Sequence, residues 1–257
     1  MAKRPLSLNL PLDLPAASGS ASVGTGGRKQ TLSDAVYRKL SADIVAGRLA
    51  PGVKLGFEML RREYGFGVSP LREALQRLTA ENLVEAEGRI GFRVAAVSLK
   101  DLEDINRLRL VLEPMALADA ITNANLAWEE RVVAAAHRLK RTSVPVDVKG
   151  AGADRWEDAH RDFHDALISG CSSQALLQFS RTLFAQFRRY RRMFLETYWR
   201  SGALQREIAG EHDAIVAAAL ARDAKRATAA LTRHYKLGGE RVVAACRKQV
   251  KSTSRSR

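Results

Sequence analysis

Apolar residues recur at helical spacing through the first ordered third of the chain, in three short runs separated by turn residues. The first run starts at Leu32, and Gly47 ends it. A second short helix is expected over residues 58–64. A third is expected to begin with Ser69 as its N-cap and Pro70 in its first turn, which suits amide groups that have no partner inside a helix.

The periodicity then changes to that of short strands. Strands are expected over residues 83–86 and 92–95, joined by a glycine-containing turn over residues 87–91. Three helices followed by a hairpin is the order of elements in a winged helix-turn-helix. The sequence therefore predicts a DNA-binding domain of this type over residues 31–97.

From Ser98 onward the apolar period stays near 3.6 residues, which predicts an all-helical bundle over residues 98–250. The main internal loop is expected over residues 142–152, which contain Pro145 and Gly150. The fold class is mainly α. The helices of this second domain are expected near residues 99–123, 127–141, 153–169, 173–199, 203–221 and 223–248.

The two ends of the chain differ from the rest in composition. Residues 1–30 are rich in Pro, Ser, Gly and Ala, and residues 251–257 are basic, so both are expected to be disordered tails. Prolines interrupt the N-terminal segment, which argues against a signal peptide.

Bulk composition limits the partners and the compartment. The 257 residues carry a net charge of +14, which favours polyanions, with nucleic acid ahead of a membrane surface. There are two cysteines, too few for a disulfide framework, so a reducing cytoplasm is expected. No apolar run reaches the length of a membrane span, so no membrane partner is expected.

The third helix is the expected recognition helix, which enters the major groove with its N-terminal residues against base edges. Arg72 lies in its first turn, where a guanidinium can pair with guanine, and Ser69 is placed for a phosphate. A lone surface arginine is usually just solvated, so the assignment depends on the whole set. The predicted DNA-binding residues are Arg61, Arg62, Ser69, Arg72, Arg77, Arg89 and Arg93.

Four of the five histidines fall in predicted helices of the second domain in a way that suggests one metal site. His160 and His164 are one turn apart on the same helix face, and His212 and His234 lie on two later helices. Neutral imidazole is the commonest protein ligand for transition metals. The alternative is that the histidines are ordinary hydrogen-bonded core residues.

Basic residues of the second domain raise two further possibilities. Arg109 is placed to pair with the carboxylate of a small effector, although a salt bridge with Glu113 one turn later is equally compatible with the spacing. The basic and aromatic run over residues 187–192 is expected to face a wet surface or a cavity of the bundle, rather than nucleic acid.

The N-terminal motifs resemble those of the GntR family of bacterial regulators. The resemblance covers nearly all of residues 31–97, and Val68 stands where the family commonly has an arginine. The variant over residues 67–75 resembles the carbon-starvation-induced, glutarate-responsive repressors of the family. The matching motifs are Val45–Gly52, Pro70–Leu75, Arg77–Leu78, Glu81–Val84 and Gly91–Val94.

The C-terminal half resembles the FadR-type helical ligand-binding domain of the same family over about residues 99–237. In members that bind metal, an Asp and three His surround a divalent ion, commonly zinc and sometimes nickel or manganese. His160 stands here at the position of the Asp, and imidazole is also a good ligand for zinc or nickel. The motifs are Arg109–Glu113, Phe163–His164, Glu211–Ile215, Ala221–Asp223 and His234.

Together these features predict a homodimeric transcriptional regulator, most simply a repressor, that binds a palindromic double-stranded operator. A small carboxylate, such as the dicarboxylate glutarate, is expected to bind to the metal and to Arg109. Its binding is expected to change the affinity of the regulator for the operator. Two alternatives stay open: a metal-dependent hydrolase with an accessory basic domain, and a sensor whose histidines bind the effector without metal. No HExxH or GxSxG motif supports the hydrolase.

Overall fold

The N-terminal domain is a winged helix-turn-helix, as the sequence predicts. The computed structural model describes residues 31–88, 91–143, 151–194 and 201–255. Thr31 begins the first helix with a capping box, in which its side chain and that of Asp34 each accept from the other's backbone amide. The helices are α1 (Leu32–Val45), α2 (Phe57–Tyr64) and α3 (Val68–Ala80).

The hairpin that follows α3 forms the wing. Strand β1 (Val84–Glu87) pairs antiparallel with β2 (Gly91–Val94), and Val84 lies opposite Val94. The two valines are buried with the apolar faces of α1, α2 and α3 in one core. The two strands of the wing are therefore packed against the helices.

Helix α3 begins earlier than its cap chemistry predicts. Gly67 is the N-cap and makes no side-chain hydrogen bond, so Ser69 is a first-turn residue and not the cap. Pro70 is tolerated there because the first four amides of a helix have no intrahelical acceptor. The exposed Ser69 hydroxyl is thus left available to an outside partner.

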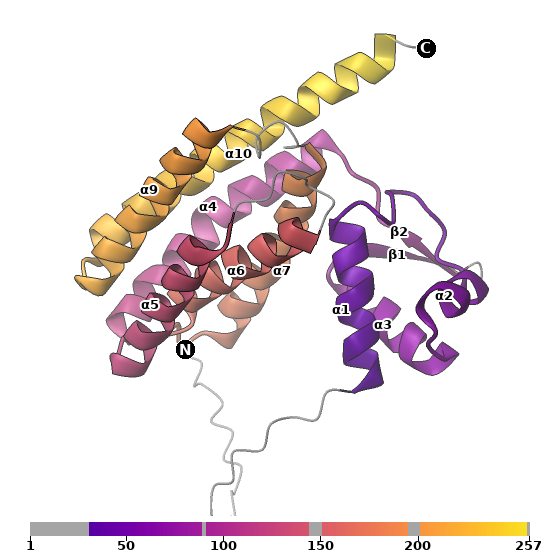
Figure 1. Cartoon of the computed structure of the whole chain (residues 1–257), viewed down its shortest axis with the longest axis horizontal. Coiled ribbons are helices and arrows are strands. Elements are labelled where there is room, and N and C mark those ends of the chain that lie inside the picture. The colour runs from indigo at the N-terminus through magenta and orange to yellow at the C-terminus, as the bar shows by residue number, and fades with distance from the viewer. Residues whose placement is uncertain (1–30, 89–90, 144–150, 195–200, 256–257) are drawn as a thin grey trace, which may run out of the picture. The chain divides into compact units, whose positions relative to one another are not determined.

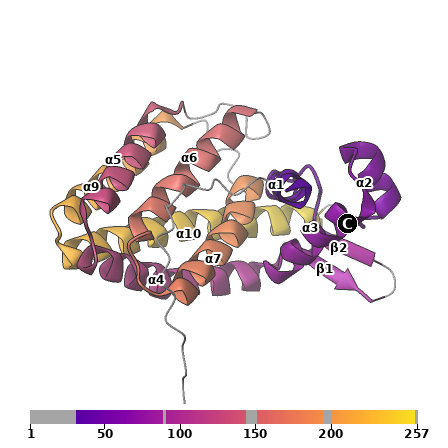
Figure 2. The ribbon, with the colours of Figure 1, turned by 90° about the horizontal axis from the view of Figure 1, so that it is seen from below.

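The C-terminal domain is the predicted helical bundle (Figures 1 and 2). Side chains of Ser98, Asn125 and Ser201 cap three of its helices by accepting first-turn amides. The helix bounds agree with the predicted ranges to within two residues, except at the end of the last helix and for residues 195–199, which lie outside the described residues. The helices are α4 (Leu99–Thr122), α5 (Leu126–Arg141), α6 (Ala151–Ile168), α7 (Gln174–Phe194), α9 (Gly202–Leu220) and α10 (Ala224–Arg255).

The tails and loops are only partly covered by the described residues. Helix α10 continues to Arg255, so the expectation of disorder over residues 251–257 is wrong up to that residue. No glycine or proline interrupts the chain there, which lets the helix continue. The predicted N-terminal tail and the centre of the 142–152 loop lie outside the described residues.

The core of the bundle forms where α4, α5, α6, α9 and α10 face one another. Trp128 of α5 is fully buried, and its indole N–H donates to the carbonyl of Leu167 at 3.2 Å. Helix α10 lies alongside α4 and α9, as both views show. Among the described helices, none combines the length and apolar character that crossing a bilayer requires.

Gly170, between α6 and α7, provides a test of this packing. An added Cβ would lie 2.9 Å from the carbonyl oxygen of Ala120 and 3.1 Å from Cδ1 of Trp128. We expect Gly170→Ala to lower the free energy of unfolding by about 1–3 kcal/mol, because neither neighbour can move freely. Urea unfolding measures this. Gly210→Ala in α9, which meets no atom within 4 Å, should be neutral or slightly stabilising; equal effects would contradict the packing argument.

Candidate functional site

The four histidines singled out in the sequence converge inside the bundle. Helix α6 supplies His160 and His164, α9 supplies His212, and α10 supplies His234. One ring nitrogen from each lies within 4.8 Å of the others, and none of the rings is more than 8% exposed. Three separate helices therefore hold these four rings in one cluster.

Hydrogen bonds fix the orientation of two of these rings. Nδ1 of His234 lies 2.7 Å from Oε2 of Glu211, and Nδ1 of His164 lies 2.9 Å from the hydroxyl of Tyr235. The Tyr235 hydroxyl in turn donates to Glu113. Each Nδ1 is engaged outside the cluster, so each Nε2 is free to face the cluster centre. This arrangement is typical of metal-ligating histidines.

Burial keeps the cluster uncharged. Removal from water lowers the pKa of His160, His164 and His212 well below the usual value, and lowers the pKa of His234 to about 3. Neighbouring positive groups, among them Arg191, act in the same direction. At neutral pH the rings therefore offer lone pairs.

The donor set fits a divalent transition metal. Nε2 of His212 is buried and has no hydrogen-bond partner among the described residues, a costly arrangement unless something else binds there. Neutral imidazoles suit zinc, copper, nickel or iron better than calcium or magnesium. The residues that would hold such an ion are His160, His164, His212 and His234.

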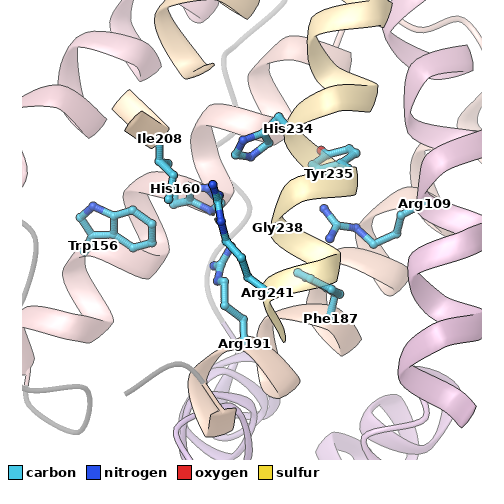
Figure 3. Close-up of a pocket in the computed structure, with 10 residues that line it drawn as sticks. All are labelled: Arg109, Trp156, His160, Phe187, Arg191, Ile208, His234, Tyr235, Gly238 and Arg241. Atoms are coloured by element: carbon cyan, nitrogen blue, oxygen red, sulfur yellow. Dashed lines mark hydrogen bonds between the residues drawn. The ribbon is translucent and has the colours of Figure 1, made fainter. Parts of the chain in front are cut away.

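A small cavity of about 30 Å³, partly open to solvent, adjoins the histidine cluster (Figure 3). Its described lining contains three arginines and no carboxylate. In Figure 3 they extend from three different helices: Arg109 from α4, Arg191 from α7 and Arg241 from α10. The complete lining is Arg109, Trp156, His160, Phe187, Arg191, Ile208, His234, Tyr235, Gly238 and Arg241.

Arg109, the one arginine predicted for the effector, is already paired. Its Nε donates to Glu113 at 2.6 Å, and its guanidinium lies 4.1 Å from the ring centre of Tyr235. Burial disfavours its charge, but Glu113 and Tyr235 together outweigh this effect, and the pKa of Arg109 is raised. The structure thus realises the Glu113 salt bridge that the spacing allowed, and contact with an effector stays a prediction.

Arg191 and Arg241 were not predicted as site residues. Arg191 belongs to the basic run over residues 187–192, whose four arginines are all buried, so the expectation of a cavity-facing run holds for Arg191. Its Nη2 donates to Glu157 at 2.5 Å. Arg241 pairs with Glu207 at 2.7 Å. The sequence offered one signal for these arginines, which is that basic residues recur every few positions on a helix with apolar periodicity. This pattern does not indicate which of their side chains point into the bundle.

The predicted DNA-binding residues fall into two groups. Arg61, Arg62, Ser69 and Arg72 are exposed on α2 and α3, and the Arg72 guanidinium lies 5.3 Å from the ring centre of Phe57. The other residues of the set either form salt bridges within the protein or lie outside the described residues. Arg77 pairs with Asp34 at 2.7 Å, Arg93 pairs with Glu87 at 2.5 Å, and Arg89 lies outside the described residues.

Two family matches cover both domains. Residues 32–94 match the bacterial regulatory proteins of the gntR family, and residues 104–237 match the FCD domain. The chain belongs to the GntR family. This confirms the resemblance seen in the sequence motifs, and the FCD match coincides with the helices that carry the histidine cluster.

Relatives of this GntR-family regulator agree with that assignment. It is 40% identical to an uncharacterised HTH-type transcriptional regulator, BphR of Paraburkholderia xenovorans, over 80% of this chain and 82% of the relative. It is 37% identical to the HTH-type transcriptional repressor GlaR of Escherichia coli, over 77% and 90%. The solved structure of E. coli McbR/YncC shares the fold, with a TM-score of 0.67 at 23% identity, over 85% of this chain and 99% of that one.

These findings give the regulator its general function. It is a DNA-binding transcriptional regulator with an FCD effector-binding domain. The relatives are regulators and not enzymes, so the hydrolase alternative is set aside.

The neutral histidine cluster predicts a pH dependence of the metal-free protein. The unfolded chain takes up protons near pH 6.5, whereas the folded cluster does not, so stability falls as the pH drops below about 6.5. Each ring adds a slope of up to about 1.4 kcal/mol per pH unit. Urea unfolding between pH 7.5 and 5.5, with a chelator present, measures it. His212→Gln, which removes one buried ring, should reduce the slope by up to about 1.4 kcal/mol per pH unit.

Proposed function

We propose that this regulator is a metal-loaded, carboxylate-responsive repressor that acts as a homodimer on a palindromic operator. The observation that carries the proposal is the cavity beside the histidine cluster, lined by three arginines and by no carboxylate among its described residues. Such a lining favours an anionic small molecule. The relative GlaR is a transcriptional repressor, which supports repression as the direction of regulation.

The chemistry of the cavity supports a carboxylate in particular. Guanidinium groups bind carboxylates through parallel hydrogen bonds, and Arg191 and Arg241 present theirs from two helices. Tyr235 and Phe187 add aromatic surface for the carbon chain. A zinc or nickel ion held by His164, His212 and His234 would supply Lewis-acid binding of a carboxylate oxygen at the floor of the cavity.

Helix α7 provides a route from the cavity to the DNA-binding domain. It carries Arg191 at the cavity, and it carries Arg189 and Gln186 two and five residues earlier. Arg189 donates to the carbonyl of Ala95, just after β2, and Gln186 donates to that of Glu81, the C-cap of α3, at 2.9 Å. An anion that changes the position of Arg191 would therefore shift a helix that is bonded to the end of α3 and to the residue after β2. Such contacts could differ between the free and the effector-bound states, as allostery requires.

An apolar stripe on α4 supports the homodimer. Leu108, Val111 and Met115 are 47%, 53% and 56% exposed at helical spacing, and Phe179 of α7 is 62% exposed. Large apolar side chains gathered on one face are typical of a protein interface. A second copy related by a two-fold axis would cover this stripe and would match the symmetry of a palindromic operator.

Replacing Arg72 tests the DNA-reading helix. We expect Arg72→Ala to weaken binding to the regulator's own promoter fragment by about 1–3 kcal/mol and to relax discrimination at one base pair. Fluorescence anisotropy with the native and single-base variant fragments measures both effects. Lys100→Ala removes an equivalent charge from the start of α4 and should leave specificity unchanged. Unchanged binding by Arg72→Ala would contradict the assignment.

Filling the cavity tests the effector site. Gly238 lines the cavity and an added Cβ would meet no atom within 4 Å, so the larger side chain of Gly238→Leu can start without a clash and should block the anion; thermal unfolding without effector checks that the variant folds. We expect glutarate with zinc to raise the melting temperature and lower the operator affinity of the wild type, and to do neither in Gly238→Leu. Gly210→Leu, on an exposed part of α9, should respond as the wild type does.

Two outcomes would contradict the proposal in different ways. If no member of a panel of mono- and dicarboxylates changes either readout, with or without zinc, the regulator is not carboxylate-responsive. If glutarate acts equally in the wild type with and without a chelator, but not in His212→Ala, the histidines bind the effector without metal. Elemental analysis of protein purified without a nickel resin accompanies both measurements.

A further inference from the structure

The orientation of His160 differs from that of the other cluster histidines. Its Nδ1 lies 3.2 Å from Nη1 of Arg191. A guanidinium has only donors, so Nδ1 of His160 must be the acceptor and must carry a lone pair. A neutral imidazole with a lone pair on Nδ1 holds its proton on Nε2, the atom that faces His164.

The neighbouring hydrogen bonds run in the same direction. Tyr235 uses its proton toward Glu113, so Nδ1–H of His164 donates to the Tyr235 oxygen and Nε2 of His164 keeps the lone pair. Nε2 of His160 lies 3.2 Å from Nε2 of His164, and its proton completes this chain. That separation would also suit two ligands of one tetrahedral zinc, whose nitrogen atoms lie about 3.4 Å apart for bonds near 2.1 Å. The distance alone therefore does not show whether His160 is a hydrogen-bond donor or a metal ligand. The position of its proton distinguishes the two.

Arg191 is held firmly in the position that imposes this tautomer. It is 9% exposed, and Glu157, which is fully buried, accepts from its Nη2 at 2.5 Å. The His160 ring is stacked on Trp156, with ring centres 4.7 Å apart and planes 16° apart. Neither side chain can turn without breaking a buried ion pair or a ring stack.

We propose that His160 is not a fourth metal ligand but a hydrogen-bond donor, locked by Arg191, that points its Nε2–H toward a three-histidine metal site. The proposal rests on the proposed function and deepens it. Three imidazoles leave a coordination position open for an exogenous anion, whereas four would close the site in the manner of a structural zinc. Once an ion takes the lone pair of His164 Nε2, the Nε2–H of His160 would be left to donate to an oxygen of that anion, which makes His160 and Arg191 determinants of specificity.

Cobalt titration of the full-length protein separates three ligands from four. Co²⁺ absorbs visible light far more strongly in a tetrahedral site than in a five- or six-coordinate one. We expect His160→Gln to keep one Co²⁺ per chain, the wild-type spectrum and an unchanged Kd, while His164→Gln weakens binding by about 100-fold or more. His160→Gln losing as much affinity as His164→Gln would overturn the proposal.

Removing the Arg191 guanidinium should have the opposite effect and strengthen metal binding. In Arg191→Met the Nδ1 of His160 loses its donor, so the proton can move to Nδ1 and Nε2 can become a ligand. We expect tighter Co²⁺ binding, by about tenfold, and a more intense, tetrahedral spectrum. An unchanged spectrum and Kd in a folded Arg191→Met protein, judged by thermal unfolding, would overturn the role of Arg191.

A measurement on metal-free wild-type protein keeps this inference distinct from the proposed function. Long-range ¹H–¹⁵N correlation spectra report which ring nitrogen of a histidine carries the proton. We expect protonated Nε2 for His160 and protonated Nδ1 for His164 and His234. A protonated Nδ1 on His160 would overturn the inference while leaving a metal-dependent regulator intact. The expected tautomers in a wild type that binds no Co²⁺ would instead overturn both the open metal site and the metal part of the proposed function.

Discussion

Four imidazoles buried in one cluster impose the constraint on which the helical domain depends. Burial keeps every ring neutral, so each ring has one N–H and one lone pair, and each needs a suitable partner. The partners come from outside the cluster: Arg191 donates to His160, and Tyr235 and Glu211 accept from His164 and His234. The lone pair of His212 Nε2 has no such partner among the described residues. The cluster and these partners therefore join α4, α6, α7, α9 and α10 through buried hydrogen bonds.

The family and the fold could be predicted from the sequence because both depend on local patterns. Apolar periodicity and capping residues such as Ser98 and Asn125 placed the helices, and turn residues such as Gly65 placed their ends. The start of α3 was placed wrongly because Ser69 has the chemistry of a cap, whereas Gly67 supplies only the extended conformation that a cap needs. Helix starts depend on backbone conformation as well as on side-chain hydrogen bonds.

The site could be predicted only in part, for a physical reason. The histidines are rare, and their helical spacing marked them as a set, so all four could be found. Arginines are common, and which of them turns inward depends on the buried acid that pairs with it. Glu157, fully buried on α6, decides that Arg191 lines the cavity. The two residues of such a pair lie on different helices, far apart in the sequence. The pair therefore cannot be predicted from residue spacing and is found only once the packing of the helices is known.

The charges around the cavity explain why an anion, and not a further protein group, is the expected occupant. The buried acids near the cavity already face arginines: Glu113 faces Arg109, and Glu157 faces both Arg188 and Arg191. Arg188 also pairs with Asp158 at 3.3 Å, so the guanidiniums have carboxylate partners, but a divalent ion on neutral imidazoles would add two further charges. Buried charge of one sign is costly unless a counter-charge is brought in. Glu211, which contacts Nδ1 of His234, would offset part of the charge of the ion, and an anionic effector would supply the rest.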